Sequence, residues 1–214
     1  MSKYNRTYHL PFSPGATNDD RISNDISSLL NTEIIITEKL DGENCGIIKE
    51  GVYARSHSTF TTSNWSKEVR QIHSLIQNNL DEGVYLFGEN MEGIHSIEYS
   101  NLTSYFYLFG IKENNRWLSW KEVEEYAYLL DLKTVPILFK GILKTKKELK
   151  ELIEDLIKKP SKLGGELEGV VVRKYDEFLN EDFKKYVMKW VRKNHVQTDE
   201  HWTKNWRKAK INYE

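Results

Sequence analysis

The spacing of apolar residues predicts three helices. Between residues 63 and 80, apolar side chains recur every three or four positions, which is the period of one helix face. Two capping boxes, each a Ser or Thr followed three residues later by Glu, begin two more helices: Ser119 with Glu122, and Thr145 with Glu148. The expected helices therefore cover residues 63–80, 119–130 and 145–158.

Short runs of β-branched and aromatic residues predict strands between and beyond these helices. The expected strands are 33–37, 46–49, 51–55, 84–89, 105–112, 135–139, 169–174 and 186–191. The second and third are close enough for a tight hairpin over Glu50 and Gly51. The first twenty residues contain Pro11, Pro14 and Gly15, which predict an irregular start to the chain.

Strands and helices are intermixed without a regular alternation, and this order bears on the fold class. A doubly wound parallel sheet would need a helix after almost every strand. The sequence therefore favours an α+β fold with mainly antiparallel sheets flanked by helices. We find no internal repeat and no Pro/Gly-rich linker, and 214 residues suffice for one generous domain.

Composition narrows the class of protein. The 31 basic and 32 acidic residues nearly cancel, so overall charge does not indicate a nucleic acid or a membrane as partner. The single cysteine, Cys45, excludes an intramolecular disulfide framework and fits a reducing compartment. No apolar run approaches the ~18 residues of a membrane span. We expect a cytoplasmic protein, in the host cytoplasm if a phage encodes it, without a membrane partner.

Positive charge is concentrated near the C-terminus. From Phe183 onwards there are nine basic residues and three acidic ones. Aromatic residues, among them Trp190, Trp202, Trp206 and Tyr213, are interleaved with them. Cations together with aromatic platforms suit a nucleic acid strand. A solvated terminal helix whose tryptophans pack inward explains the same pattern, and the residues alone leave both interpretations open.

The segment from Glu38 to Asn44 is the strongest candidate for chemistry. It places Lys39 three residues after the end of the apolar run 34–36, with Glu38 and Asp41 on either side and Gly42 in a turn behind. An ordinary lysine has a pKa near ~10.4, so a lysine nucleophile needs burial or cationic neighbours. Lys185 or Lys189 could supply the neighbouring charge. A plain strand followed by a solvated turn is the alternative.

Two more carboxylates lie at strand ends. Glu89 closes the strand 84–89, and Glu168 directly precedes the strand 169–174. Each alone could be a solvated surface residue. Together with Lys39 they would form a pocket for a nucleoside triphosphate and a divalent cation.

The order of these motifs along the chain resembles that of a known protein family. Lys-x-Asp-Gly is followed sixteen residues after the lysine by Arg55, then by Phe-Gly-Glu, an aromatic strand ending at Phe109, Glu-Gly-Val-Val-Val-Arg and a lysine-bearing strand. This set resembles the covalent nucleotidyltransferases, and Glu38 and Asn44 make it similar to the RNA ligase 2-type family. The resemblance covers roughly residues 33–193. It implies an ATP-grasp-like adenylation domain spanning 1–214, with its motifs in 38–193, a basic aromatic tail in 194–214 and no OB-fold domain.

The resemblance also implies residue roles. Lys39 would attack the α-phosphate of ATP and hold AMP, while Lys189 would neutralise the phosphate charge. Glu168 would organise Mg²⁺ or Mn²⁺, with Asp41 and Asn44 contributing through its waters. The residues expected to contact the nucleotide are Glu38, Asn44, Arg55, Glu89 and Phe109, with Lys185 or Arg192 replacing a lysine that the family usually has two positions after Lys189.

These roles imply an ATP-dependent RNA ligase that joins 5′-phosphate and 3′-hydroxyl ends through a lysyl-AMP and an adenylated 5′ end. Its partner would be RNA ends, and it would act as a monomer. A small DNA ligase for nicked duplex, a guanylyltransferase, and a nucleic-acid-binding protein without turnover are the alternatives. For the N-terminal segment 6–11 we expect a packing role.

Overall fold

Two β-sheets form the framework of the computed structural model, which describes residues 2–55, 59–193 and 202–212. The first sheet has the order β1-β12-β10-β2-β9. Its strands are β1 (Tyr8–His9), β12 (Val187–Val191), β10 (Gly169–Lys174), β2 (Glu33–Lys39) and β9 (Ile137–Ile142). All neighbours are antiparallel except β1 and β12.

The second sheet has the order β11-β7-β6-β5-β3-β4, with β8 parallel to β6. Its strands are β11 (Phe178–Leu179), β7 (Arg116–Trp117), β6 (Phe106–Glu113), β5 (Val84–Asn90), β3 (Glu43–Ile48), β4 (Gly51–Ala54) and β8 (Lys133–Thr134). The expected α+β fold with mainly antiparallel sheets is confirmed.

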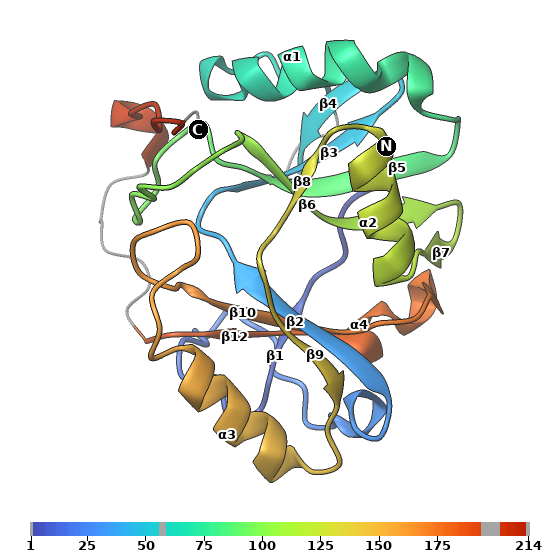
Figure 1. Cartoon of the computed structure of the whole chain (residues 1–214), viewed down its shortest axis with the longest axis vertical. Helices are drawn as coiled ribbons and strands as arrows, with labels where there is room; N and C mark the ends of the chain where they lie inside the picture. Colours follow the sequence, from blue (N-terminus) through green and yellow to red (C-terminus); the bar gives the residue numbers. More distant parts are fainter. Residues whose placement is uncertain (1, 56–58, 194–201, 213–214) are drawn as a thin grey trace.

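The longer helices cover the outer faces of the two sheets (Figure 1). They are α1 (Lys67–Ile76), α2 (Trp120–Leu129) and α3 (Lys146–Leu156), with a short α4 (Phe183–Tyr186). Helix α3 buries Leu149 and Ile153 against Ile34 and Val170 of the first sheet. This packing explains the uninterrupted apolar run of β2, because both faces of that strand are covered.

Helix α2 begins with the capping box that the sequence predicts. Ser119 Oγ accepts a bond from Glu122 N, and Glu122 Oε2 accepts one from Ser119 N at 2.7 Å. We expect Ser119→Ala to lower the free energy of unfolding by about 1 kcal/mol, measured by urea denaturation. Ser74→Ala, on the exposed face of α1, is the control. Equal stability of the two variants would contradict a capping role for Ser119.

The predicted elements are found with shifted ends. The helix expected over 63–80 is an α-helix flanked by 3-10 turns at Asn64–Ser66 and Gln77–Asn79. The hairpin turn lies at Lys49 and Glu50, because Ile48 pairs with Gly51. The expectation of an irregular start missed β1, whose two residues are too few to show a period.

The C-terminal segment lies partly outside the described residues, which omit 194–201. Beyond the 3-10 turn Trp202–Asn205, the chain runs along residues 92–102 through backbone bonds such as Ala209 N to Glu92 O. Lys208 Nζ contacts Glu68 at 2.5 Å, and Trp206 packs against Trp65. Among the described residues, this segment forms no long terminal helix. Its nucleic acid contact stays a prediction.

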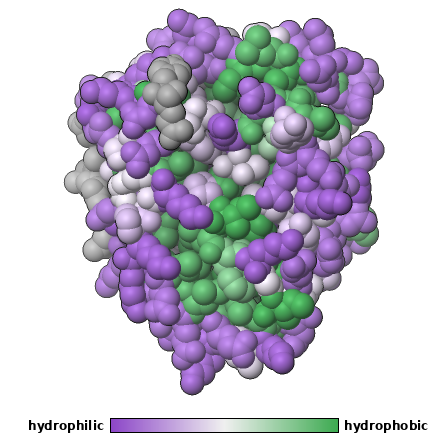
Figure 2. All heavy atoms as spheres, in the orientation of Figure 1, coloured by the Kyte–Doolittle hydropathy of each residue, from purple (hydrophilic) through white to green (hydrophobic). Residues whose placement is uncertain are grey.

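The described helices include none with the length and apolar character needed to cross a bilayer. Hydrophilic residues cover most of the face shown in Figure 2, and apolar residues gather near its centre.

Candidate active site

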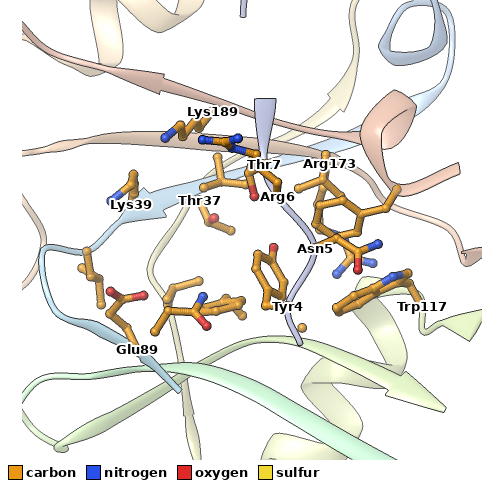
Figure 3. A pocket seen from close by; sticks show the side chains of 18 of the residues that line it. Tyr4, Asn5, Arg6, Thr7, Thr37, Lys39, Glu89, Trp117, Arg173 and Lys189 are labelled. Atoms are coloured by element: carbon orange, nitrogen blue, oxygen red, sulfur yellow. The ribbon is translucent and has the colours of Figure 1, made fainter. Parts of the chain in front are cut away.

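A pocket of about 350 Å³ lies between the two sheets, and most of the predicted site residues border it. Lys39 and Lys189 reach it from the first sheet, and Glu89 from the second (Figure 3). The N-terminal segment passes through the same space on its way to β1 (Figure 1).

Lys39 ends β2 and faces Glu168 across the strand pair. Its Nζ lies 2.8 Å from both carboxylate oxygens of Glu168. The β10–β2 register sets this contact, because Gly169 pairs with Lys39 and Glu168 directly precedes it. Residue 169 must be glycine, since a Cβ there would lie 2.2 Å from Trp190 O. The sequence-predicted pair of strand-terminal residues is therefore brought together.

The charge around Lys39 keeps it protonated in this structure. Burial lowers its pKa, but the acids around it, above all the Glu168 carboxylate, outweigh burial and raise the pKa above its ordinary value. A nucleophilic amine needs the opposite shift. Attack by Lys39 therefore requires that the negative charge of these acids be compensated first.

Glu89 stands at the end of β5, where the β3–β5 register pairs it with Asn44. Burial raises the pKa of its carboxyl to about 8, with Lys39 opposing and Glu168 and Asp41 adding to the increase. Near neutral pH this group is therefore largely protonated, so that the pocket does not hold three full negative charges at once.

This raised pKa predicts a pH-dependent stability. Because folding raises the carboxyl pKa of Glu89 from 4.5 to about 8, its ionisation destabilises the fold as pH rises through that window. We expect Glu89→Gln, which mimics the protonated acid, to gain stability over wild type between pH ~5 and ~8.5. Urea denaturation at several pH values measures the difference.

Glu82→Gln, at an exposed turn before β5, is the matched control and should follow the wild-type profile. A constant difference between Glu89→Gln and wild type across this pH range would contradict the assignment.

The oxygen donors beside Lys39 fit a hard divalent cation held together with a substrate phosphate. Glu168 offers a carboxylate, and Asn44 Oδ1 is buried without a hydrogen-bond partner. The described residues contain no preformed group of three or more His, Cys, Asp or Glu placed to hold a metal. Mg²⁺ commonly needs only one or two carboxylates plus substrate phosphates and water.

Asp41, predicted to contact the waters of a metal ion, forms hydrogen bonds to the backbone in the structure. Its Oδ2 accepts bonds from the backbone N–H groups of Ser96 and Ile97, at 2.7 and 2.8 Å. Tyr99 Oη accepts a bond from Asp41 N. Asp41 thus anchors the loop after β5, and its metal role stays a prediction.

The second lysine that lines the pocket is Lys189 on β12. Its Nζ lies 3.2 Å from Asp20 Oδ1. Burial lowers the pKa of Lys189, as does Lys39, while Asp20 and Glu168 oppose the decrease. The candidates for a further cation lie elsewhere: Lys185 pairs with Asp182 on the exposed side of α4, and Arg192 pairs with Glu166. The structure does not bring Lys185 to the pocket, because it extends from a helix rather than a strand.

Three other predicted residues line the pocket. Glu38 is buried, and its carboxylate accepts bonds from Ser161 Oγ and Lys162 N at 2.5 and 2.7 Å. Its side chain therefore holds the loop before β10 in place. Arg55 donates to Tyr4 O at 3.3 Å. Contacts of these two residues and of Phe109 with a nucleotide stay predictions.

The N-terminal segment also borders the pocket, although the sequence predicts only a packing role for its residues 6–11. Tyr4, Asn5, Arg6 and Thr7 line the pocket. The Tyr4 ring packs edge-on against Phe109, with ring centroids 5.0 Å apart, and burial raises its pKa to about 12. No periodicity marks these residues, and their placement depends on the long-range pairing of β1 with β12.

A strand-end lysine between two antiparallel sheets, faced by carboxylates and by a second lysine, is characteristic of the nucleotidyltransferase class. Residues 32–191 match the family model described as RNA ligase. The chain belongs to this family. No curated protein matches the sequence.

Solved structures of the Naegleria gruberi RNA ligase share the fold. A mutant with ATP and Mn is 20% identical, with a TM-score of 0.58. An apo mutant is 21% identical with a TM-score of 0.59, and the ligase with PPi is 20% identical with a TM-score of 0.56. Each match covers 90% of this chain and 56% of that chain, so this chain spans little more than half of their length.

Proposed function

We propose that the protein is an ATP-dependent RNA ligase that joins 5′-phosphate and 3′-hydroxyl ends through a lysyl-AMP on Lys39. One observation carries the proposal: the Lys39 amine lies in a pocket between the sheets, 2.8 Å from Glu168, with Lys189 and Glu89 bordering the same space. Family membership supports it. Related solved structures with ATP and Mn, with AMP and Mn, and with PPi support ATP as the nucleotide.

In the first step the Lys39 amine, after losing a proton, forms a bond to the α-phosphorus of ATP. The bond from this phosphorus to the bridging oxygen breaks, and pyrophosphate leaves. Lys189 stabilises the negative charge that develops on the α-phosphate oxygens. Glu89 binds the ribose hydroxyls, and Phe109 stacks on the adenine, a contact worth ~1–3 kcal/mol.

A divalent cation fits the donors described above. When bound, Mg²⁺ or Mn²⁺ supplies charge neutralisation at the phosphates. Glu168 would hold it, with Asn44 and Asp41 reaching its waters. Engaging Glu168 in this way would also remove the carboxylate charge that raises the pKa of Lys39.

In the second step the 5′-phosphate of an RNA end attacks the phosphorus of lysyl-AMP, and Lys39 leaves. In the third, the 3′-hydroxyl attacks the 5′-phosphate within the new anhydride, and AMP leaves. Holding both ends in one site makes this joining effectively unimolecular.

Sealing assays test this function. A 5′-labelled RNA strand would be supplied as a single strand and in a nicked RNA duplex, and a 5′-labelled DNA strand in a nicked DNA duplex, each with ATP and magnesium. We expect ATP-dependent joining of the RNA ends. Joining of the DNA nick alone would favour the DNA ligase alternative. Label transfer from GTP but not ATP would favour a guanylyltransferase, and absence of any joining would overturn the ligase proposal.

A further inference from the structure

Asp20 belongs to the pocket although no motif includes it. It comes from the irregular N-terminal part of the chain and lines the same pocket as Lys189. Its Oδ1 lies 3.2 Å from Lys189 Nζ, and the two side chains are 23% and 21% exposed. Among the ion pairs of the described residues, Lys189 pairs with no other carboxylate.

The Asp20 carboxylate has other contacts besides the one with Lys189. Its Oδ2 accepts bonds from Thr17 N and Thr17 Oγ1, each at 3.0 Å. On the other oxygen, His9 Nε2 lies 3.2 Å from Oδ1, and His9 is 1% exposed. The two Thr17 bonds restrict the rotation of this carboxylate, so it can orient the side chain that it contacts.

The backbone holds this carboxylate in register with β12. Strand β1 pairs in parallel with β12 so that His9 stands opposite Lys189. Leu10 N donates to Lys189 O at 2.8 Å, and His9 N donates to Arg21 O at 2.7 Å. Asp20 therefore approaches Lys189 from a loop that is attached to the same strand.

The ion pair between Asp20 and Lys189 affects the charge state of Lys189. Lys189 is half-buried and close to Lys39, and both conditions lower its pKa. Burial raises the pKa of Asp20, but the Thr17 bonds and Lys189 outweigh it, so the pKa of this carboxyl falls well below its ordinary value. The negative charge of Asp20 therefore opposes the decrease that Lys39 causes in the pKa of Lys189. His9 lies behind it, and Glu168 faces Lys189 from the start of β10.

We propose that Asp20 is a positioning residue for nucleotidyl transfer, which fixes the Lys189 ammonium toward the pocket. This inference rests on the proposed function. An ammonium has three N–H donors. One of them bonds to Asp20, and two remain for the phosphate oxygens of the nucleotide.

The test measures formation of the covalent nucleotide adduct with labelled ATP and magnesium in the full chain. Asp20→Asn and Asp20→Ala are expected to lower kcat for adduct formation about 10- to 100-fold. Because Lys189 acts on the developing charge, KM for ATP should stay within about twofold. The alkaline limb of the pH–rate profile should move to lower pH, because Lys189 loses the charge that opposes its deprotonation. Asp20→Glu should recover part of the rate.

Asp19→Asn is the matched control, because it changes the exposed carboxyl next to Asp20 in the same loop and leaves the Lys189 contact. It should retain most of the rate, and the urea midpoints of all variants show whether they fold. In addition, Asp20→Ala should cause no further loss when Lys189 is already alanine, since Asp20 acts only through Lys189.

Two results would overturn the inference while wild type still forms the adduct. One is a wild-type rate and pH profile in Asp20→Asn. The other is an equal loss from Asp20→Ala with and without Lys189. If wild type itself forms no adduct, the proposed function fails and this inference fails with it.

Discussion

Replacing Lys39 by alanine is expected to abolish covalent capture of AMP and sealing driven by ATP. The amine is the atom that bonds to phosphorus in the proposed first step, and no other lysine ends a strand beside Glu168 and Glu89 within the described part of the chain. Labelled ATP and a denaturing gel measure the loss, which should exceed about 10³-fold because the covalent route is removed rather than weakened.

Lys39→Arg is the matched variant that separates nucleophile from charge. Arginine keeps the positive charge beside Glu168 but does not deprotonate in proteins. It should therefore fold with wild-type stability and still capture no AMP. Labelling of either variant at a substantial rate would show that Lys39 is not the nucleophile.

Replacing Glu168 by glutamine is expected to have two opposite effects. Glu168 is the largest influence that raises the pKa of Lys39, so its removal lowers that pKa and increases the fraction of free amine at pH ~8. Trace acylation of Lys39, followed by mass spectrometry, should therefore increase. Capture of AMP should instead fall by about 10²-fold or more, because a carboxylate that would hold the divalent cation is lost.

Glu166→Gln provides the control for this experiment. Glu166 stands two residues away and pairs with Arg192, so neither acylation of Lys39 nor AMP capture should change. Reduced acylation of Lys39 in Glu168→Gln would contradict the assigned electrostatics. Undiminished AMP capture would remove Glu168 from the proposed metal site.

Strong local patterns made much of the fold predictable. The run 34–36 and the motif Gly-Val-Val-Val mark β2 and β10, and the capping box at Ser119 marks the start of α2. The strand expected over 135–139 lies instead at Ile137–Ile142, because Val135 N bonds to Leu108 O of β6. Such tertiary contacts set the ends of elements and leave no trace in local spacing.

Some residues of the candidate site could likewise be predicted from the sequence, and others could not. Lys39, Glu89 and Glu168 could be predicted because each lies at the end of an apolar strand, where a side chain reaches the edge of a sheet. Tyr4 and Asp20 could not, since both lie in an irregular segment that one parallel pairing carries into the pocket. Lys185 lies away from the pocket, although its charge made it a candidate to contact the nucleotide. The sequence does not predict the direction of α4, which sets where this side chain points.

The most direct test of the lysyl-AMP on Lys39 is the mass of the intact wild-type protein after incubation with ATP and magnesium, followed by peptide mapping. One added AMP is expected on the peptide that contains Lys39, attached through a phosphorus–nitrogen bond and released by pyrophosphate. An unmodified mass in folded protein, or AMP attached at another residue, would contradict it.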